Sequence, residues 1–495
     1  MRRPALGFVL ALAAFACATN PVTGRSELVL MSPAQESAEG KQAAAQVKQQ
    51  MGLVEDDPAL LAFVRSVGAR VAAHSPRKDV SYQFAIANMP ETNAFALPGG
   101  YVYVSRGLLA LVRSEDELAN VLAHEVGHVA ARHAAQRETR AIGVGLLTML
   151  GAAAAGVVGG AEAANAVGQL GQVAGAGLIA SYSRDQERQA DEVGQTLAKA
   201  AGYDPGGMAT FLGALDTEVT LQAGGKTRRP SFLDSHPATP ERVATATARA
   251  RTLGTTGVLA PISARSTFVS RLEGILVDED PAQGLVREQT FVHPDLDLRI
   301  QFPDGWAVQN GQDAVAAQDK EGAALIALVV QERGDDPRAA AEKFLRANAQ
   351  AVELGDHGPL KSAAVPAYQA RARVALSQGT AAAELFWLAH GGAIYRLQCL
   401  TGEQNLSTFD AAFERTAKSF RSLSSEERAG IRERRVHVVQ AAGGESLAAL
   451  AERSGNVWKL EKAALANGLE KGATLAPGQR VKIVVERPYA RGSRE

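Results

Sequence analysis

The stretch His124-Glu125-Val126-Gly127-His128 carries the most specific chemical pattern in this chain. Residues four apart on an α-helix lie on one face, so the two imidazoles can share one tetrahedral zinc ion. Glu125 lies beside them, where its carboxylate can take a proton from the attacking water. A catalytic zinc site uses three protein ligands and keeps one position open. The pattern therefore predicts such a site and requires a third ligand from elsewhere in the chain.

The sequence around this stretch predicts the helix that the pattern needs. Ser114 and Glu117 have the spacing of an N-terminal capping box. Between Leu118 and Val129, apolar residues recur at helical intervals. His133 follows the second histidine by five residues and is rotated from it by about 140°. We therefore expect His133 to point away from the metal, as a residue near the negative C-terminal end of the helix.

The candidate third ligand is Glu187, with Asp191 one helical turn later. Two carboxylates on one helical face suit a metal ligand and an acceptor that orients an imidazole N–H. Taken alone, the pair also fits a solvated acidic face among the arginines of residues 183–191.

Composition excludes several classes of protein. The 495 residues carry 52 basic and 53 acidic side chains, so no strong positive field is available to attract nucleic acid. A mean hydropathy of −0.07 excludes a polytopic membrane protein. Two cysteines cannot build a disulfide scaffold, and Cys399 lies in an apolar run that predicts a buried thiol on a strand.

Residues 1–16 have the order of an export signal. Arg2 and Arg3 precede an uncharged stretch that is too short to span a bilayer, and small residues precede Cys17. A small residue directly before Cys17 resembles a bacterial lipoprotein cleavage site, which makes Cys17 the expected site of lipidation. Cleavage at the same place by ordinary signal peptidase is the alternative.

Changes in hydrophobic periodicity and in turn residues along the sequence predict an α+β protein with several domains. Residues 17–260 read as a mostly helical domain with a small sheet, and residues 261–286 as a linker. Residues 287–424 read as a separate α+β domain of unknown role. Residues 436–486 read as a small module with the order strand, helix, helix, strand.

Residues 141–181 form an apolar tract rich in glycine and alanine within the first domain. Its uncharged first half is long enough for one bilayer crossing. A single crossing would separate His124 from Glu187 and contradict a shared metal ion. We therefore predict a helical hairpin that covers the active site or lies on a membrane surface, with an inserted hairpin as the alternative.

Four segments, residues 17–24, 89–100, 124–128 and 183–191, together resemble the lipoprotein metallopeptidases of the BepA type. That family also contains HtpX and the CAAX prenyl endopeptidases, and the resemblance extends from residue 17 to about residue 253. It implies a gluzincin-type α+β fold with one Zn²⁺ per chain on His124, His128 and Glu187. It also implies that Glu125 is the general base and that Asp191 supports a ligand.

The resemblance implies further roles near the metal. Asn93, Ala94, Phe95 and Ala96 begin a predicted strand, residues 93–104, that flanks the cleft and could pair with an extended substrate. His236 matches a histidine that can approach the zinc as a switch or transition-state donor; by itself it is a lone loop histidine. Gln189 stands where the family often has glutamate, which we interpret as a surface change with no effect on the metal.

Residues 436–486 resemble a LysM module, with Gly444-Glu445-Ser446 in place of the usual Gly-Asp-Thr. This module has two alternative roles: it binds peptidoglycan, or it is a purely structural cap. The resemblance implies a periplasmic zinc endopeptidase that is anchored to the outer membrane by lipid and cleaves misfolded or stalled envelope proteins. The 141–181 hairpin is a second candidate for membrane contact. The alternatives are an assembly chaperone with little proteolysis and a cell-wall factor acting on peptidoglycan.

Overall fold

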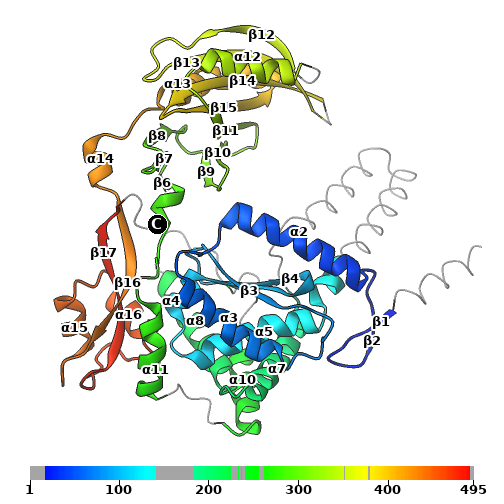
Figure 1. Ribbon diagram of the computed structural model, residues 1–495, viewed down its shortest axis with the longest axis vertical. Helices are drawn as coiled ribbons and strands as arrows, with labels where there is room; N and C mark the ends of the chain where they lie inside the picture. The colour runs from blue at the N-terminus through cyan, green and yellow to red at the C-terminus, as the bar shows by residue number, and fades with distance from the viewer. Residues whose placement is uncertain are drawn as a thin grey trace, which may run out of the picture. The chain divides into compact units, whose positions relative to one another are not determined.

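The computed structural model describes residues 17–140, 182–223, 232, 236, 240–255, 261–349, 352–376 and 379–490. The chain divides into two compact units (Figure 1). The first consists mainly of residues 52–277 and 435–485, and the second mainly of residues 278–434. The predicted signal peptide and the 141–181 hairpin lie outside the described residues. Both units combine helices with sheets, which confirms the predicted mixed fold.

Helices build most of the first unit. The longer ones are α2 (Pro33–Met51), α3 (Pro58–Ala72), α5 (Glu115–Ala130), α7 (Arg184–Ala200), α8 (Gly207–Ala223) and α10 (Pro240–Thr252). Two shorter helices are α4 (Arg106–Leu111) and α11 (Ile262–Val269), the second of which lies within the predicted linker. A short strand pair, β1 (Cys17–Thr19) and β2 (Ser26–Leu28), precedes them.

A three-stranded sheet lies beside α5 in the order β3-β5-β4. Its strands are β3 (Gln83–Ala87), β4 (Ala94–Leu97) and β5 (Tyr101–Ser105). The prediction of one strand over residues 93–104 is wrong, because the turn Pro98–Gly100 divides it into β4 and β5. Gly99 and Gly100 have φ of 75° and 95°, values that glycine adopts without strain. β4 is thereby left at the edge of this sheet.

The helix predicted around the central motif is α5. Ser114 Oγ accepts a hydrogen bond from the Glu117 amide, so the N-cap is confirmed. The capping box is not formed, because the Glu117 carboxylate accepts from the Arg113 main chain and guanidinium instead. The apolar positions Leu118, Leu122 and others of α5 are fully buried in the main core. Burial of this apolar stripe is what holds α5 in place.

α5 and α7 cross closely, and glycines make the crossing possible. A Cβ added at Gly194 would lie 2.9 Å from the His124 amide nitrogen, and one at Gly127 would lie 3.1 Å from the Ala190 carbonyl oxygen. Larger side chains at either position would push the helices apart. The small residues therefore set the distance between the histidines of α5 and the carboxylates of α7.

The C-terminal residues of the first unit contain the predicted order strand, helix, helix, strand. The elements are β16 (Arg432–Gln440), α15 (Leu447–Arg453), α16 (Leu460–Ala466) and β17 (Arg480–Pro488). Val436 and Val484 belong to the same hydrophobic core as α5. The fully buried Lys482 donates hydrogen bonds to the carbonyl oxygens of Ala110 at 2.8 Å and Val112 at 2.6 Å. These elements are thus packed directly onto the helical part of the unit.

The second unit is built on a seven-stranded sheet in the order β12-β13-β14-β15-β11-β10-β9. Its strands are β9 (Ala307–Asn310), β10 (Ala314–Gln318), β11 (Ala324–Arg333), β12 (Val352–Pro359), β13 (Ala367–Leu376), β14 (Gly379–His390) and β15 (Ala393–Gly402). A smaller sheet contains β6 (Leu285–Arg287), β7 (Thr290–His293) and β8 (Leu298–Gln301).

Two helices cover opposite faces of the larger sheet. α12 (Pro337–Ala347) packs on the face that carries Trp387, whereas α13 (Leu406–Lys418) packs on the face that carries Phe386. Adjacent residues of one strand point to opposite faces, which explains the two separate cores. Cys399 is a buried free thiol on β15, as its apolar surroundings predicted.

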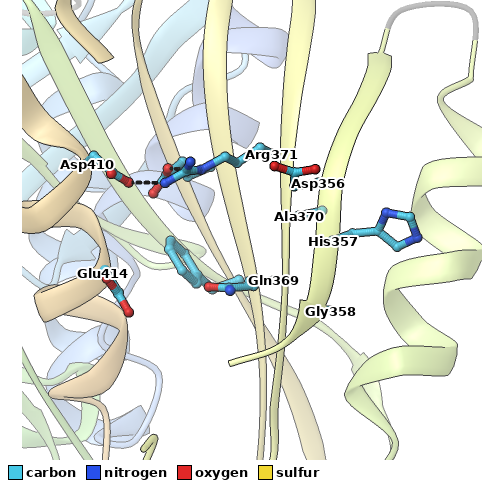
Figure 2. Close-up of a pocket in the computed structure, with 10 residues that line it drawn as sticks. Asp356, His357, Gly358, Gln369, Ala370, Arg371, Asp410 and Glu414 are labelled. Carbon is cyan, nitrogen blue, oxygen red and sulfur yellow. Dashed lines mark hydrogen bonds and ion pairs between the residues drawn. The ribbon is translucent and has the colours of Figure 1, made fainter. Parts of the chain in front are cut away.

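A cavity of about 330 Å³ in this unit is lined in part by Glu384 on β14, whose carboxyl group has a shifted pKa. Figure 2 shows Asp410 on α13 facing Arg371 on the sheet, with Glu414 on the same helix also lining the cavity. Arg371 Nε donates to Glu384 Oε1 at 2.8 Å and its guanidinium also contacts Asp410. Burial and the neighbouring Asp410 raise the pKa of Glu384 to about 8.

This raised pKa predicts a pH-dependent stability. The folded state keeps a proton on Glu384 that the unfolded chain releases above the ordinary glutamate pKa of 4.5, so the free energy of unfolding falls as pH rises from that value to about 8. In Glu384→Gln we expect the fall in the free energy of unfolding over this pH range to be smaller by about 1–3 kcal/mol. Thermal unfolding of both proteins near pH 5 and pH 9 measures it, with the exposed Glu321→Gln as control. An equal pH dependence in both proteins would contradict the prediction.

Candidate metal centre

Four buried side chains from three parts of the first unit converge on one point. α5 contributes His124 and His128, and α7 contributes Glu187. His236 comes from the segment before α10. One ligand atom of each of the four lies within 4.8 Å of the others. The sequence-predicted ligands and the predicted switch residue are therefore brought together.

The distances within this group suit a tetrahedral ion. His124 Nε2 and His128 Nε2 are 3.0 Å apart. Glu187 Oε1 lies 3.4 Å from His128 Nε2, and Glu187 Oε2 lies 3.6 Å from His124 Nε2. Ligands at ordinary zinc distances in a tetrahedral arrangement would be about 3.3 Å apart.

The outer ring nitrogens support the same conclusion. His124 Nδ1 lies 2.9 Å from Asp191 Oδ1, and His128 Nδ1 lies 2.9 Å from His133 Nδ1. If each outer nitrogen carries the ring proton, the two inner nitrogens present lone pairs to each other at 3.0 Å. Such lone pairs repel unless a cation lies between them. Two imidazoles and a carboxylate are also a common zinc ligand set, so the residues present fit this ion.

Glu125 is fully buried next to this group. Among the described residues neither of its carboxylate oxygens has a hydrogen-bond partner, and Oε1 lies 3.6 Å from His236 Nε2. Burial raises the pKa of the Glu125 carboxyl, while the positive charge of nearby histidines and the main-chain amide of Ala96 act in the opposite direction. Among the described residues, the main-chain amide of Ala96 and the ring of His236 are thus the polar groups nearest to its oxygens.

Carboxylates on α7 are held ionised despite burial. Burial alone would raise the pKa of Glu187, but its interactions with His236 and His128 hold it below its usual value. Asp191 is likewise buried, and its hydrogen bonds with His124 and Arg242 lower its pKa. The negative charges are therefore available to balance a bound cation.

His236 is held by aromatic stacking and by polar contacts. Its ring stacks on Phe232 with centroids 4.2 Å apart and an interplanar angle of 15°. Its Nδ1 lies 2.9 Å from Glu187 Oε1 and 3.3 Å from His124 Nε2. His236 is therefore within the candidate ligand group in this structure.

Arg242 on α10 is a residue of the site that the sequence analysis missed. Its guanidinium makes two hydrogen bonds of 2.8 Å to the Asp191 carboxylate, and Nη1 lies 2.8 Å from Glu187 Oε2. Arg242 shares one helical face with Ala246 and Ala250, both of which are buried. An arginine at the start of an apolar stripe was the available signal, because a buried cation needs a buried anionic partner.

The structure corrects two expectations about residues around the metal group. His133 lies outside the metal group, as expected, but its full burial in contact with the outer nitrogen of His128 was not expected of a residue near the helix end. Gln189 was interpreted as a surface position without effect on the metal, yet its Oε1 lies 2.7 Å from His133 Nε2. Tyr182, also missed, stacks on His128 with centroids 4.0 Å apart.

The predicted substrate strand adjoins this group. Asn93 precedes β4 and exchanges hydrogen bonds with Ser105: its amide donates to Ser105 Oγ, and its carbonyl accepts from the Ser105 amide. Ala94, Phe95 and Ala96 lie in β4, which pairs with β5 on one side. β4 is the edge strand, so its other side has no partner strand within the described sheet.

Cys17 begins β1, where it pairs with Leu28. Within the described ranges, no helix is both long enough and apolar enough to cross a bilayer.

Comparison with known proteins agrees with this geometry. Residues 58–250 match peptidase family M48. The beta-barrel assembly-enhancing protease of Escherichia coli K12 is 32% identical over 239 residues, which cover 47% of each chain. The mitochondrial metalloendopeptidase OMA1 of Schizosaccharomyces pombe is 32% identical over 182 residues, covering 37% of this chain and 50% of the relative.

A third relative is the metalloprotease LoiP of Escherichia coli K12, 32% identical over 163 residues that cover 33% of this chain and 60% of the relative. The chain thus spans about half the length of the curated relatives it matches. The matched region contains His124, His128, Glu187 and His236, the four residues that meet in the structure. Residues 58–250 of this chain therefore form a peptidase domain of the zinc-dependent family M48.

Proposed function

We propose that this protein is a zinc metalloendopeptidase of the bacterial envelope that cleaves misfolded or stalled envelope proteins. The observation that carries the proposal is the convergence of His124, His128 and Glu187 beside a buried Glu125. The names of the relatives, two metallopeptidases and a protease that enhances β-barrel assembly, support the class of reaction and of substrate.

In this proposal, His124, His128 and Glu187 hold the zinc ion. When bound, zinc supplies Lewis-acid activation of water and of the scissile carbonyl. Asp191 fixes the ring of His124 through its Nδ1, and Arg242 in turn fixes both carboxylates of α7. The ligands are thereby oriented before substrate arrives, which reduces the reorganisation needed during the reaction.

Glu125 acts as the general base. Its unpaired carboxylate takes a proton from the attacking water and later delivers that proton to the leaving amine. His236 Nε2, which lies 3.6 Å from Glu125 Oε1, is placed to donate to the oxyanion that forms at the scissile carbonyl. The same histidine contacts Glu187, so it can also serve as a switch by competing for the metal group.

The substrate binds in extended form along β4. In an antiparallel pair, the main-chain groups of alternate residues point toward the partner strand. The Ser105 amide bonds to the Asn93 carbonyl, so Asn93 and Phe95 face β5 while Ala94 and Ala96 face the open edge. Ala94 and Ala96 thus offer the main-chain donors and acceptors for a substrate strand next to Glu125.

Further features concern location. Cys17 is the proposed lipid attachment site that anchors the protein to the outer membrane from the periplasm. Residues 436–486 are proposed to act as a LysM-like module, and the exposed turn Gly443-Gly444 is the proposed contact with peptidoglycan. Retention of the purified protein on sacculi, and its loss when this turn is altered, would test the second point.

The activity is tested with the purified full chain and an unfolded protein substrate. We expect one zinc per chain, cleavage of the substrate, loss of cleavage after removal of zinc with a chelator, and recovery after zinc is returned. Cleavage that continues in fully zinc-free protein would refute the proposed mechanism. A zinc-loaded protein that binds the substrate but never cuts it would favour the chaperone alternative.

A further inference from the structure

We propose that His133 and Gln189 are positioning residues that select the ring tautomer of His128 able to bind metal. The inference rests on the proposed function, because it concerns a ligand of the same zinc site. It concerns the other ligand histidine, His128, whose outer ring nitrogen contacts His133 and, within the described part of the chain, no carboxylate.

The three side chains form a continuous hydrogen-bonded chain from α5 to α7. His128 Nδ1 lies 2.9 Å from His133 Nδ1, and His133 Nε2 lies 2.7 Å from Gln189 Oε1. His133 is fully buried and Gln189 is half-buried. Water therefore has little access to the His128–His133 and His133–Gln189 contacts. Each of these ring nitrogens must then find its hydrogen-bond partner among these three side chains.

The directions of these hydrogen bonds are coupled. A neutral imidazole has one N–H donor and one acceptor nitrogen. The Gln189 oxygen can only accept, so His133 Nε2 must carry the proton and His133 Nδ1 must accept. His128 Nδ1 must then donate, which leaves the lone pair of His128 Nε2 directed at the metal group.

Replacing the acceptor at position 189 with a donor would reverse the direction of both hydrogen bonds in this series. A donor in place of the Gln189 oxygen would make His133 Nε2 the acceptor and His133 Nδ1 the donor. His128 Nδ1 would then accept, and the ring proton of His128 would move to Nε2, where it blocks metal binding. A side chain 2.7 Å from His133, two residues from Glu187, thus controls a ligand on another helix.

Three substitutions at Gln189 separate this role from simple packing. Gln189→Glu keeps an acceptor at similar size, and we expect zinc affinity within about threefold of wild type. Gln189→Lys provides only donors, and we expect zinc affinity to fall by about 10- to 100-fold. Gln189→Met provides neither, and its affinity should lie between the two.

Zinc affinity of the full-length proteins is measured by competition with a chromophoric chelator, and the Co²⁺ spectrum reports whether four-coordinate binding persists. Glu192→Gln, on the exposed side of α7, changes the charge by the same amount as Gln189→Lys and should bind zinc like wild type. Circular dichroism checks that each variant is folded. If Gln189→Lys does not fold, the order Glu above Met decides the question.

Equal zinc affinity in Gln189→Glu, Gln189→Met and Gln189→Lys would overturn the inference while leaving the proposed function intact. An affinity of Gln189→Lys equal to that of Gln189→Met would also overturn it, because the two side chains are similar in size and only lysine offers a donor. Failure of the wild-type protein to bind zinc is a different result, because it would remove the proposed function itself.

Discussion

Replacing Glu125 with glutamine is expected to lower kcat/KM for an unfolded protein substrate by about 100- to 10,000-fold while zinc stays bound. Glutamine has nearly the same shape but cannot take a proton from water. The wild-type carboxylate is fully buried, and neither of its oxygens has a hydrogen-bond partner among the described residues. The substitution therefore leaves the supporting contacts of the ligands unchanged and removes the base alone.

The measurement pairs zinc content by elemental analysis with initial rates of cleavage. Asp185→Asn is a suitable control, because Asp185 lies on the same α7 that carries Glu187 but is largely exposed. It should retain both zinc and activity. A zinc-loaded Glu125→Gln protein as active as wild type would show that another group removes the proton, and loss of zinc in this variant would show that Glu125 is a ligand.

Replacing Lys482 with methionine is expected to reduce the free energy of unfolding of the first unit by about 2–4 kcal/mol. The side chain is fully buried, and its amine donates to the carbonyl oxygens of Ala110 and Val112. Methionine fills similar space but leaves both carbonyls without a donor. These carbonyls lie just before Ser114, the N-cap of α5, so the defect adjoins the helix that carries His124.

The contribution of Lys482 to the free energy of unfolding should also depend on pH. Burial lowers the pKa of its amine well below the ordinary lysine value of 10.5. Between the folded-state pKa and that value the unfolded chain binds the proton and the folded protein does not, so the free energy of unfolding rises with pH. The methionine variant lacks this rise. The difference in stability between the two proteins should therefore grow from neutral pH toward about pH 10.

The loss of stability is measured by calorimetry or by the thermal inactivation of cleavage. The Lys482→Met substitution should lower the unfolding midpoint of the first unit by about 5–10 °C. Lys471→Met is the matched control, because Lys471 belongs to the same C-terminal residues but its side chain is 62% exposed. It should unfold like wild type. An unchanged midpoint in Lys482→Met would mean that the two hydrogen bonds of Lys482 add no net stability to the unit.

Much of the fold followed from local patterns in the sequence. The helix around His124 was predicted because burial of one face imposes a period on the residues. The same kind of pattern predicts a helix over about residues 183–201 and an alternating strand over residues 368–376, and both are present as α7 and β13. The sequence pattern did not predict α8. It also predicts a helix over residues 337–353, but α12 ends at Ala347. Residues 352–359 form β12 instead, because pairing with β13 outweighs local helical preference.

The sequence alone determined the identity of the zinc-binding chemistry, because the spacing of His124 and His128 on one helix is a local property. Only the tertiary structure decided how those side chains are supported. Arg242 reaches Asp191 across 51 positions of sequence, and Gln189 reaches His133 across 56. Buried polar groups take whatever partner the fold brings near them, and hydrogen-bond geometry depends on helix crossings that no local pattern specifies.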